Sequence, residues 1–440
     1  MSQLKCLAVV AGFLAATLSA APAPAQDRKP ISWWYETITP ENRDLLQSML
    51  VEPFNAAHPD QELSVDIRGT ELDKQLRVAL LSGAGPDIVY TAGPSYVAAM
   101  AQAGQLLPLD DYAAKLGWND RLLPLFLQLG QYNGKLYALP KTYETLGLFY
   151  NKTLFDQNGW QPPKTIAELE TLAEAMKAKG LVPFAAGNAD WRPANEHYVS
   201  MVFNSIAGPD NVYKALTGEI PWTAEPFVRS IDTLNKWWQA GYFGPNYFSL
   251  TGEQAFAQVA TGQAGMAPTG TWNFQNVPRY FPAANAVPAF AGFPSADGVP
   301  YPIYALGIGS TFSIAATSQN PDGAAAVIDR VFSDDFYGEI NSVWQGEWNT
   351  PLKDLSKVKM SADVLPLYTD TMKTLAASVA AGQYGYTTWT FLPPATDTYL
   401  VSGVEEVWLG RITTAQFLEK LDQTFKQEKA QGKVPAVPAR

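Results

Sequence analysis

The sequence is poor in the residues on which most metal sites and nucleophilic enzymes depend. Its 440 residues include one cysteine, Cys6, and two histidines, His58 and His197. A single thiol forms no internal disulfide, and so few imidazoles and thiols supply a transition metal poorly. Neither histidine lies in a triad-like pattern, and no Gly-x-Ser-x-Gly turn occurs. We therefore expect no catalytic residues, no metal and no cofactor.

Positive charge and long apolar runs are also scarce. The formal net charge is −11 at pH 7, which argues against nucleic acid and anionic membrane surfaces as partners. After residue 25 no apolar run is long enough to span a bilayer, so we expect no membrane insertion of the mature chain. Aromatic residues, in contrast, are plentiful, with 13 Trp, 20 Tyr and 21 Phe. Most belong in a core, but a surplus of Trp also suits stacking on sugar rings.

Residues 1–25 are typical of a cleavable signal peptide. Lys5 precedes an apolar run from Leu7 to Leu18, and the small-residue motif Ala23-Pro24-Ala25 follows. We expect cleavage after Ala25 and export to the periplasm. Cys6 lies before the apolar run, so it does not mark a lipoprotein anchor and leaves with the signal peptide.

Strands alternate with helices along the chain, which favours an α/β fold with helices on both faces of each sheet. Short apolar or alternating segments predict strands at 31–35, 63–67 and 88–90. Thr39 with Pro40 predicts a helix start, and Thr165 with Glu168 forms a capping box. These βα units predict open sheets, which bind ligands beyond the carboxyl ends of their strands.

The chain is longer than one ordinary core supports, so two lobes are expected. We assign residues 26–142 and 304–345 to lobe 1, and residues 143–303 and 346–440 to lobe 2. The backbone then crosses between the lobes three times. Such multiple crossings restrict the relative motion of the lobes to a hinge.

Several short motifs occur in an order that resembles the bacterial extracellular solute-binding proteins for sugars, the maltose-binding-like class. A hinge-like segment runs from Ala138 to Lys152, with Glu144 midway. The other motifs are Gly85-Pro86-Asp87-Ile88-Val89, Gly104-Gln105-Leu106-Leu107-Pro108-Leu109, Asn133-Gly134-Lys135-Leu136-Tyr137-Ala138-Leu139-Pro140, Tyr150-Asn151-Lys152, Pro163-Lys164-Thr165, and Gly262-Gln263-Ala264-Gly265-Met266 before Gly270-Thr271-Trp272.

The resemblance implies a two-lobed periplasmic-binding-protein fold of type II. Each lobe is then an open, mostly parallel sheet flanked by helices, and a multi-crossing hinge joins the lobes. It also implies a monomeric, non-enzymatic component of an ABC transporter. Such a protein captures a mono- or oligosaccharide or a glycoside by hinge closure and delivers it to a membrane permease.

The expected ligand-binding residues follow predicted strands or lie at the hinge. By position, the resemblance matches Glu144 to a carboxylate that bonds sugar hydroxyls and Trp272 to an aromatic platform. Arg192 raises the possibility of an acidic sugar. The full set of expected residues is Glu36, Thr37, Thr91, Ser95, Tyr143, Glu144, Asp190, Trp191, Arg192, Trp272, Asn273, Gly307, Gln345 and Trp348.

Two other classes of function stay open. A secreted glycoside hydrolase also has Trp platforms and acids, but it needs two carboxylates at a fixed separation, which a moving hinge preorganises poorly. A polyamine binder on the same scaffold would likewise use acids and aromatic rings. The chain departs from the maltose-binding pattern at Thr91-Ala92-Gly93-Pro94-Ser95, where small uncharged residues follow the third strand. We therefore do not expect a ligand bound in the manner of maltose.

Overall fold

The computed structural model describes residues 28–36, 38–190 and 195–440. A first sheet has the strand order β12-β11-β3-β1-β2, and β6 also pairs with β11. β1 runs parallel to β2 and β3, whereas β11 runs antiparallel to β3 and β6. These strands are β1 (Lys29–Tyr35), β2 (Gln61–Ile67), β3 (Ile88–Thr91), β6 (Leu139–Glu144), β11 (Tyr304–Ile314) and β12 (Tyr384–Tyr386).

A second sheet has the order β10-β7-β9-β8. The prediction of a mostly parallel sheet does not hold for its strand directions, because β7 runs antiparallel to β9 and β10 and only β8 and β9 are parallel. The reason is that β7 continues directly from β6 and starts at the hinge, whereas β8 and β9 lead toward it. The strands are β7 (Leu146–Asn151), β8 (Val182–Phe184), β9 (Ala264–Gly270) and β10 (Pro288–Ala291).

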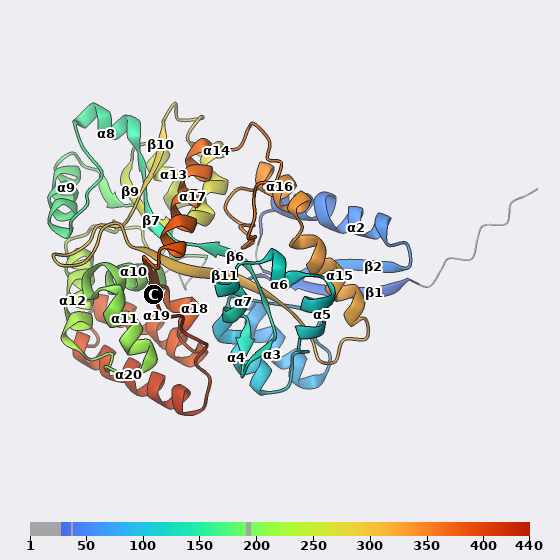
Figure 1. Cartoon of the computed structure of the whole chain (residues 1–440). Coiled ribbons are helices and arrows are strands. Elements are labelled where there is room, and N and C mark those ends of the chain that lie inside the picture. The colour runs from blue at the N-terminus through green and yellow to red at the C-terminus, as the bar shows by residue number, and fades with distance from the viewer. Residues whose placement is uncertain (1–27, 37, 191–194) are drawn as a thin grey trace, which may run out of the picture.

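Helices surround both sheets, and a small hairpin of β4 (Gln131–Tyr132) and β5 (Lys135–Leu136) lies beside the first (Figure 1). The helices beside the first sheet are α1 (Pro40–Leu46), α2 (Glu52–Ala57), α3 (Leu72–Ser82), α4 (Pro94–Gln102), α5 (Asp110–Lys115), α6 (Trp118–Arg121), α7 (Pro124–Leu129), α15 (Pro321–Val331) and α16 (Asp334–Val343). Those beside the second are α8 (Lys152–Asn158), α9 (Ile166–Ala178), α10 (Asn195–Val202), α11 (Pro209–Thr217), α12 (Glu225–Gln239), α13 (Gly252–Ala260), α14 (Val277–Tyr280), α17 (Pro366–Ala380), α18 (Thr388–Phe391), α19 (Pro394–Trp408) and α20 (Thr414–Ala430).

Local signals set several helix ends as the sequence predicts. The Thr39 hydroxyl accepts a hydrogen bond from the Asn42 amide, 3.2 Å away, at the start of α1. Thr165 and Glu168 form the expected capping box of α9. These bonds satisfy backbone N–H groups that a helix start otherwise leaves without partners.

Two hydrophobic cores divide the molecule into two lobes. The first core draws on residues 31–139 and 312–352, and the second on residues 126–308 and 364–425. β6 and β11 each contribute to both cores and pass between the two groups of elements near the centre of Figure 1. The chain crosses a third time between residues 352 and 364. The exact lobe boundaries given above stay a prediction.

Within the described ranges, no helix combines the length and apolar character needed to cross a bilayer.

Candidate ligand-binding cleft

A cavity of about 360 Å³ lies between the two lobes and is lined by residues from both. It meets the carboxyl ends of β1 and β3, as expected for an open α/β sheet. The lining residues are Glu36, Ile38, Thr39, Asn42, Ala92, Thr142, Glu144, Asp190, Glu196, His197, Glu253, Trp272, Gln275, Asn276, Gly309, Ser310, Trp344, Glu347 and Trp389.

An irregular stretch of β11 shapes the floor of this cleft. The pairing of β11 with β6 shifts register around Ser310, and such irregularities re-aim side chains at binding sites. A Cβ atom on Gly309 would lie 2.6 Å from Glu144 Oε2. The glycine therefore lets the Glu144 carboxylate approach the strand closely.

The second lobe supplies its part of the wall from a loop and a helix start. Asp190 lies on the loop after β8, and Glu196 and His197 lie in the first turn of α10. The side-chain amides of Asn188 and Asn195 both donate to Glu405 Oε1, each at 2.7 Å. These bonds anchor Asn188, near Asp190, and Asn195, next to Glu196, to the same carboxylate.

A smaller cavity of about 200 Å³ continues the cleft into the second lobe. It shares Asp190, His197 and Trp272 with the main cavity and adds Asn273. The Asn273 amide donates to Thr269 Oγ1 at 2.8 Å. Trp272 therefore borders both cavities.

A charged network lies under the first-lobe side of the cleft. Lys141 is fully buried and its Nζ lies 2.6 Å from Glu347 Oε1. The same nitrogen donates to the hydroxyls of Tyr35 and Tyr90, at 3.1 and 3.2 Å. Tyr90 in turn donates to Glu36 Oε1 at 2.5 Å. Removing one member of such a buried network leaves an uncompensated charge.

Burial raises the pKa values of the two carboxyl groups nearest this network. The pKa of Glu36 rises to about 7, first through burial and then through the charge of Glu347, with Lys141 opposing. The pKa of Glu144 rises to about 8 for the same reasons in the same order. Both groups therefore hold protons more tightly than a solvated carboxyl group does.

Glu196, which lines the cleft, forms a second acidic pair with Asp397, which does not line it. The two side chains are within hydrogen-bonding reach, and both residues are more than nine-tenths buried. Burial, followed by the nearby Asp397, raises the pKa of Glu196 well above its usual value. The two carboxyl groups are thus each other's hydrogen-bond partner, with one proton between them.

Three aromatic rings form one wall of the cavity. The His197 ring contacts both Trp272 and Trp389, with centroid distances of 4.8 and 5.4 Å. The two indoles meet edge to face at 6.2 Å. Burial lowers the pKa of His197 to about 3, so this imidazole is neutral at physiological pH. The wall therefore offers ring surface without positive charge.

Two buried hydroxyl groups of the lining have no partner. They belong to Thr142 on β6 and Ser310 on β11. Because a buried hydroxyl that makes no hydrogen bond is costly, these groups are suited to bond a polar ligand.

Hydrogen bonds join the lobes across one end of the cleft. Gln275 Oε1 accepts from the Asn42 amide at 3.1 Å and from the Trp344 indole at 2.8 Å. Asn42 and Trp344 belong to the first lobe, and Gln275 belongs to the second. Gln275 therefore joins the two lobes at the edge of the cleft.

Some of the ligand-binding residues expected from the sequence line the cleft. Glu36, Glu144, Asp190 and Trp272 line the main cavity, and Asn273 lines its extension. Gly307 lies just behind, where an added Cβ would be 2.8 Å from the Trp389 ring and 3.1 Å from Glu144.

Other expected residues are buried behind the wall and do not line it. The Thr91 hydroxyl bonds that of Thr311, and the Ser95 hydroxyl donates to the Trp389 carbonyl. Tyr143 packs in the second core, and Gln345 accepts from the Leu365 amide. Trp348 is fully buried in the first core, 6.2 Å from the stacked Tyr35 ring. Its ring is used for packing because Lys141 covers one face, with Nζ 4.4 Å from the ring centroid.

The remaining expectations concern the signal peptide at 1–25, Thr37, Trp191 and Arg192, which lie outside the described residues.

Sequence reasoning missed several residues of the wall. Glu196 and His197 begin a helix and follow no strand, so the strand-end rule does not find them. Trp344 and Glu347 lie in the irregular segment after α16, whose Trp-rich composition signals a site but not which side chains face it. Trp389 lies in the short helix α18, which packs on α4, α10 and β11 and so places the residue at the cleft.

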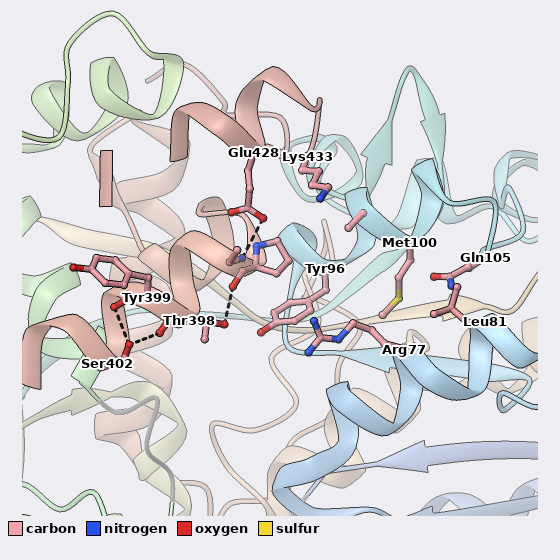
Figure 2. A pocket seen from close by; sticks show the side chains of 13 residues that line it. Arg77, Leu81, Tyr96, Met100, Gln105, Thr398, Tyr399, Ser402, Glu428 and Lys433 are labelled. Carbon is pink, nitrogen blue, oxygen red and sulfur yellow. Dashed lines mark hydrogen bonds between the residues drawn. The ribbon is translucent and has the colours of Figure 1, made fainter. Parts of the chain in front are cut away.

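A larger groove, of about 760 Å³, lies elsewhere between the lobes and shares no lining residue with the cleft. Figure 2 shows it between α3 and α4 on one side and α19 and α20 on the other. Its Glu428 carboxylate already accepts from the amides of Ala395 and Thr396 at the start of α19. The groove lacks the convergent unpartnered polar atoms of the cleft, so we place the functional site in the cleft.

Two known proteins are similar to this chain in sequence. It is 26% identical over 312 residues to an uncharacterised ABC transporter extracellular-binding protein of Pyrococcus horikoshii, covering 68% of this chain and 66% of the relative. It is 27% identical to a maltotriose-binding protein of Pyrococcus abyssi, covering 57% and 51%. The chain thus spans between half and two thirds of the length of these relatives.

Solved structures support the fold. A chitin oligosaccharide binding protein superposes with a TM-score of 0.80 at 22% identity, covering 92% of this chain and all of the other. The GacH receptor of Streptomyces glaucescens, described in complex with acarbose, gives a TM-score of 0.70 at 20% identity, covering 91% and 98%. The family model described as bacterial extracellular solute-binding protein matches residues 39–336. That match covers more than half of the sequence, and the chain belongs to this family of solute-binding proteins.

Proposed function

We propose that this protein captures a saccharide in the interlobe cleft and delivers it unmodified to an ABC-transporter permease. The observation that carries the proposal is the cleft's composition. The Trp272 indole and the unpartnered hydroxyls of Thr142 and Ser310 line the same cavity. A sugar ring has a C–H face that packs on indole and a rim of hydroxyls that both donate and accept hydrogen bonds.

The mechanism follows from the hinge. In the open state the saccharide contacts one lobe, and closure brings the other lobe's polar groups onto it. Three crossings limit the motion to hinge bending. Because the ligand contacts both lobes only when the cleft is closed, binding shifts the population toward that state. The hydrogen bonds of Gln275 to Asn42 and Trp344 belong to the closed state of the protein.

Membership of the family supports further proposals about the oligomeric state, the compartment and the permease. The protein acts as a monomer in the periplasm after loss of the signal peptide, and the closed form is what the permease recognises. The proposed binding residues are Glu36, Glu144, Asp190, Trp272 and Asn273 from the sequence, together with Thr142, Glu196, His197, Ser310, Glu347 and Trp389 from the cleft wall.

A thermal-shift panel tests the proposal. Mono-, di- and oligosaccharides are each added to the purified chain, and at least one should raise Tm in a concentration-dependent way, because a ligand of the native state stabilises it by mass action. The stabilising saccharide is then recovered and analysed. Intact saccharide supports capture, whereas hydrolysis products would replace capture with glycoside hydrolysis.

A further inference from the structure

We propose that Lys141 is a positioning residue for saccharide binding, which holds the carboxyl groups of Glu36 and Glu347 in place at the first-lobe side of the cleft. This inference rests on the proposed saccharide-binding function. It adds the buried residue on which the ligand's contacts with the first lobe depend.

Lys141 acts from behind the cleft wall. Its side chain is fully buried, and the residue does not line the cavity. On β6, Pro140 and Thr142 pair with consecutive residues of β11, which leaves Lys141 between them as an extra residue. A bulge of this kind re-aims a side chain relative to a regular strand and is common beside binding sites. The local backbone of β6 therefore sets the direction of the Lys141 side chain.

The hydrogen-bond donors of the Lys141 ammonium group are all used. Nζ donates to Glu347 Oε1 at 2.6 Å and to the hydroxyls of Tyr35 and Tyr90 at 3.1 and 3.2 Å. An ammonium group has three N–H bonds, one for each of these acceptors. The nitrogen also lies near the rings of Tyr35, Tyr90 and Trp348, at 5.4, 5.3 and 4.4 Å from their centroids. These contacts fix the position of the cation.

Two of the contacts lead to residues that line the cleft. Glu347 itself lines the cavity. The Tyr90 hydroxyl donates to Glu36 Oε1 at 2.5 Å, and Glu36 also lines the cavity. The bonds use Oε1 of each carboxyl group, and each group has a second oxygen with which to bond a ligand. One buried cation thus sets the positions of two carboxyl groups of the wall.

Stability alone does not explain this ion pair. Replacing a buried ion pair with well-packed apolar residues is often neutral or stabilising, because the pair no longer has to lose its hydration. The pair of Lys141 and Glu347 lies where it connects the cavity wall to the interior of the first lobe. Its position favours a role in ligand binding.

The two carboxyl groups suit the hydroxyl groups of a saccharide. Glu347 forms the ion pair with Lys141, so its carboxylate accepts hydrogen bonds only. The pKa of Glu36 rises to about 7, first through burial and then through the charge of Glu347, with Lys141 opposing. Near neutral pH Glu36 therefore also donates a hydrogen bond in part of the molecules. A saccharide hydroxyl both donates and accepts, so it can bond either group.

Calorimetric titration of the purified protein tests the inference. The probes are D-glucose, D-galactose, D-mannose, D-xylose, maltose, cellobiose and N,N′-diacetylchitobiose, and the one that binds the wild type most tightly is used for every variant. Lys141→Met should raise its Kd by about tenfold or more, equivalent to ~1.4 kcal/mol. The physical reason is that both carboxyl groups lose the contacts that hold them.

The double variant Lys141→Met/Glu347→Gln separates positioning from stability. Lys141→Met alone leaves a buried carboxylate without its cation and should lower Tm. The double variant removes both charges and should recover Tm relative to Lys141→Met. Its Kd should remain about tenfold or more above that of the wild type. A wild-type Kd in the double variant would assign the pair a structural role and overturn the inference.

Tyr90→Phe tests the link to Glu36 without removing a charge, and it decides the inference if Lys141→Met does not fold. It should raise Kd by about threefold or more through the lost hydrogen bond. Tyr386→Phe is the matched control, because Tyr386 is as buried as Tyr90 and its hydroxyl donates to the Pro438 carbonyl, at 2.7 Å, away from the cleft. This control should keep the wild-type Kd. A wild-type Kd in Tyr90→Phe as well would overturn the inference.

The remaining outcomes distinguish the two proposals. If a probe binds the wild type and Lys141→Met equally tightly, the positioning role is overturned and saccharide capture stands. If no probe binds the wild type, saccharide capture is overturned, and the positioning role falls with it.

Discussion

Trp272 is half-buried in the short helical segment after β9, and its ring borders both the cleft and the extension of the cleft. It packs against His197 and Trp389, so removing it opens one wall without cutting through either hydrophobic core. Its ring supplies apolar surface that no neighbouring polar residue replaces. Substitution of Trp272 is therefore the most direct single test of whether the cleft binds the ligand.

Trp272→Ala should weaken saccharide binding by about tenfold or more, because the stacking face is lost. The unliganded Tm should change little. Trp160→Ala is the matched control, since Trp160 is also a half-buried tryptophan of the second lobe but packs on Phe155 outside the cleft. Calorimetric titration should give the wild-type Kd for this control. Unchanged affinity in Trp272→Ala would remove the residue from the site.

Glu144 predicts a particular pH dependence of stability. Its pKa is about 8 in the folded protein against an ordinary value of 4.5, so the folded chain holds a proton that the unfolded chain releases. The stability contributed by that proton is complete below about pH 4.5 and is lost as the pH rises through 8. Burial of Glu36 acts in the same direction, with a pKa of about 7.

Glu144→Gln should therefore flatten the fall in the free energy of unfolding between pH 5 and 8.5, measured by urea denaturation without ligand. The variant should gain relative to wild type at pH 8.5 and not at pH 5. Some slope remains because Glu36 still titrates. Parallel wild-type and variant profiles would show that Glu144 has a nearly ordinary pKa.

At the scale of elements, helix starts were the part of the fold most open to prediction from sequence. A cap depends on residues three or four apart, so Thr39 and Thr165 predicted α1 and α9 correctly. Strand direction in the second sheet was not predictable in this way. It depends on which end of β7 meets the hinge, a property of the whole chain path.

Among the cleft residues too, those placed by local sequence signals were predictable, and those placed by tertiary packing were not. Residues directly after strands, such as Glu36, were found because parallel strands deliver their carboxyl ends to one edge. Glu196 and Trp389 reach the cleft through helix packing, which sequence spacing does not encode. Trp344 and Trp348 are close in sequence, yet only Trp344 lines the cleft, because irregular backbone leaves no periodicity from which to read side-chain direction.

The capping box of α9 provides a test at this scale. Thr165→Ala should lower the free energy of unfolding by about 1 kcal/mol, because the Glu168 amide loses its acceptor. Thr171→Ala, a matched change on the same helix at an exposed position, should have a much smaller effect. Affinity for the stabilising saccharide should be unchanged in both variants. A loss in Thr171→Ala as large as that in Thr165→Ala would contradict the capping explanation.

At the scale of the whole molecule, the hinge couples the cleft to the shape of the protein. Small-angle scattering should show a smaller radius of gyration with the stabilising saccharide than without it, because binding favours the closed state. Gln275→Ala should weaken binding, since it removes the acceptor that joins Asn42 and Trp344 to the second lobe.

Gln258→Ala is the control for that variant, because Gln258 lies on α13 and does not line the cleft. It should leave both the scattering curve and the Kd as in wild type. A saccharide that binds with no compaction in the wild type would contradict hinge closure.

The position of β11 also governs when the molecule can fold. This strand lies between β3 and β12 in the first sheet, yet it follows β3 by more than two hundred residues along the chain. During synthesis the amino-terminal lobe therefore stays incomplete until most of the polypeptide has emerged, because such long-range pairing closes late. A nascent chain that cannot complete its first sheet early therefore remains unfolded for longer.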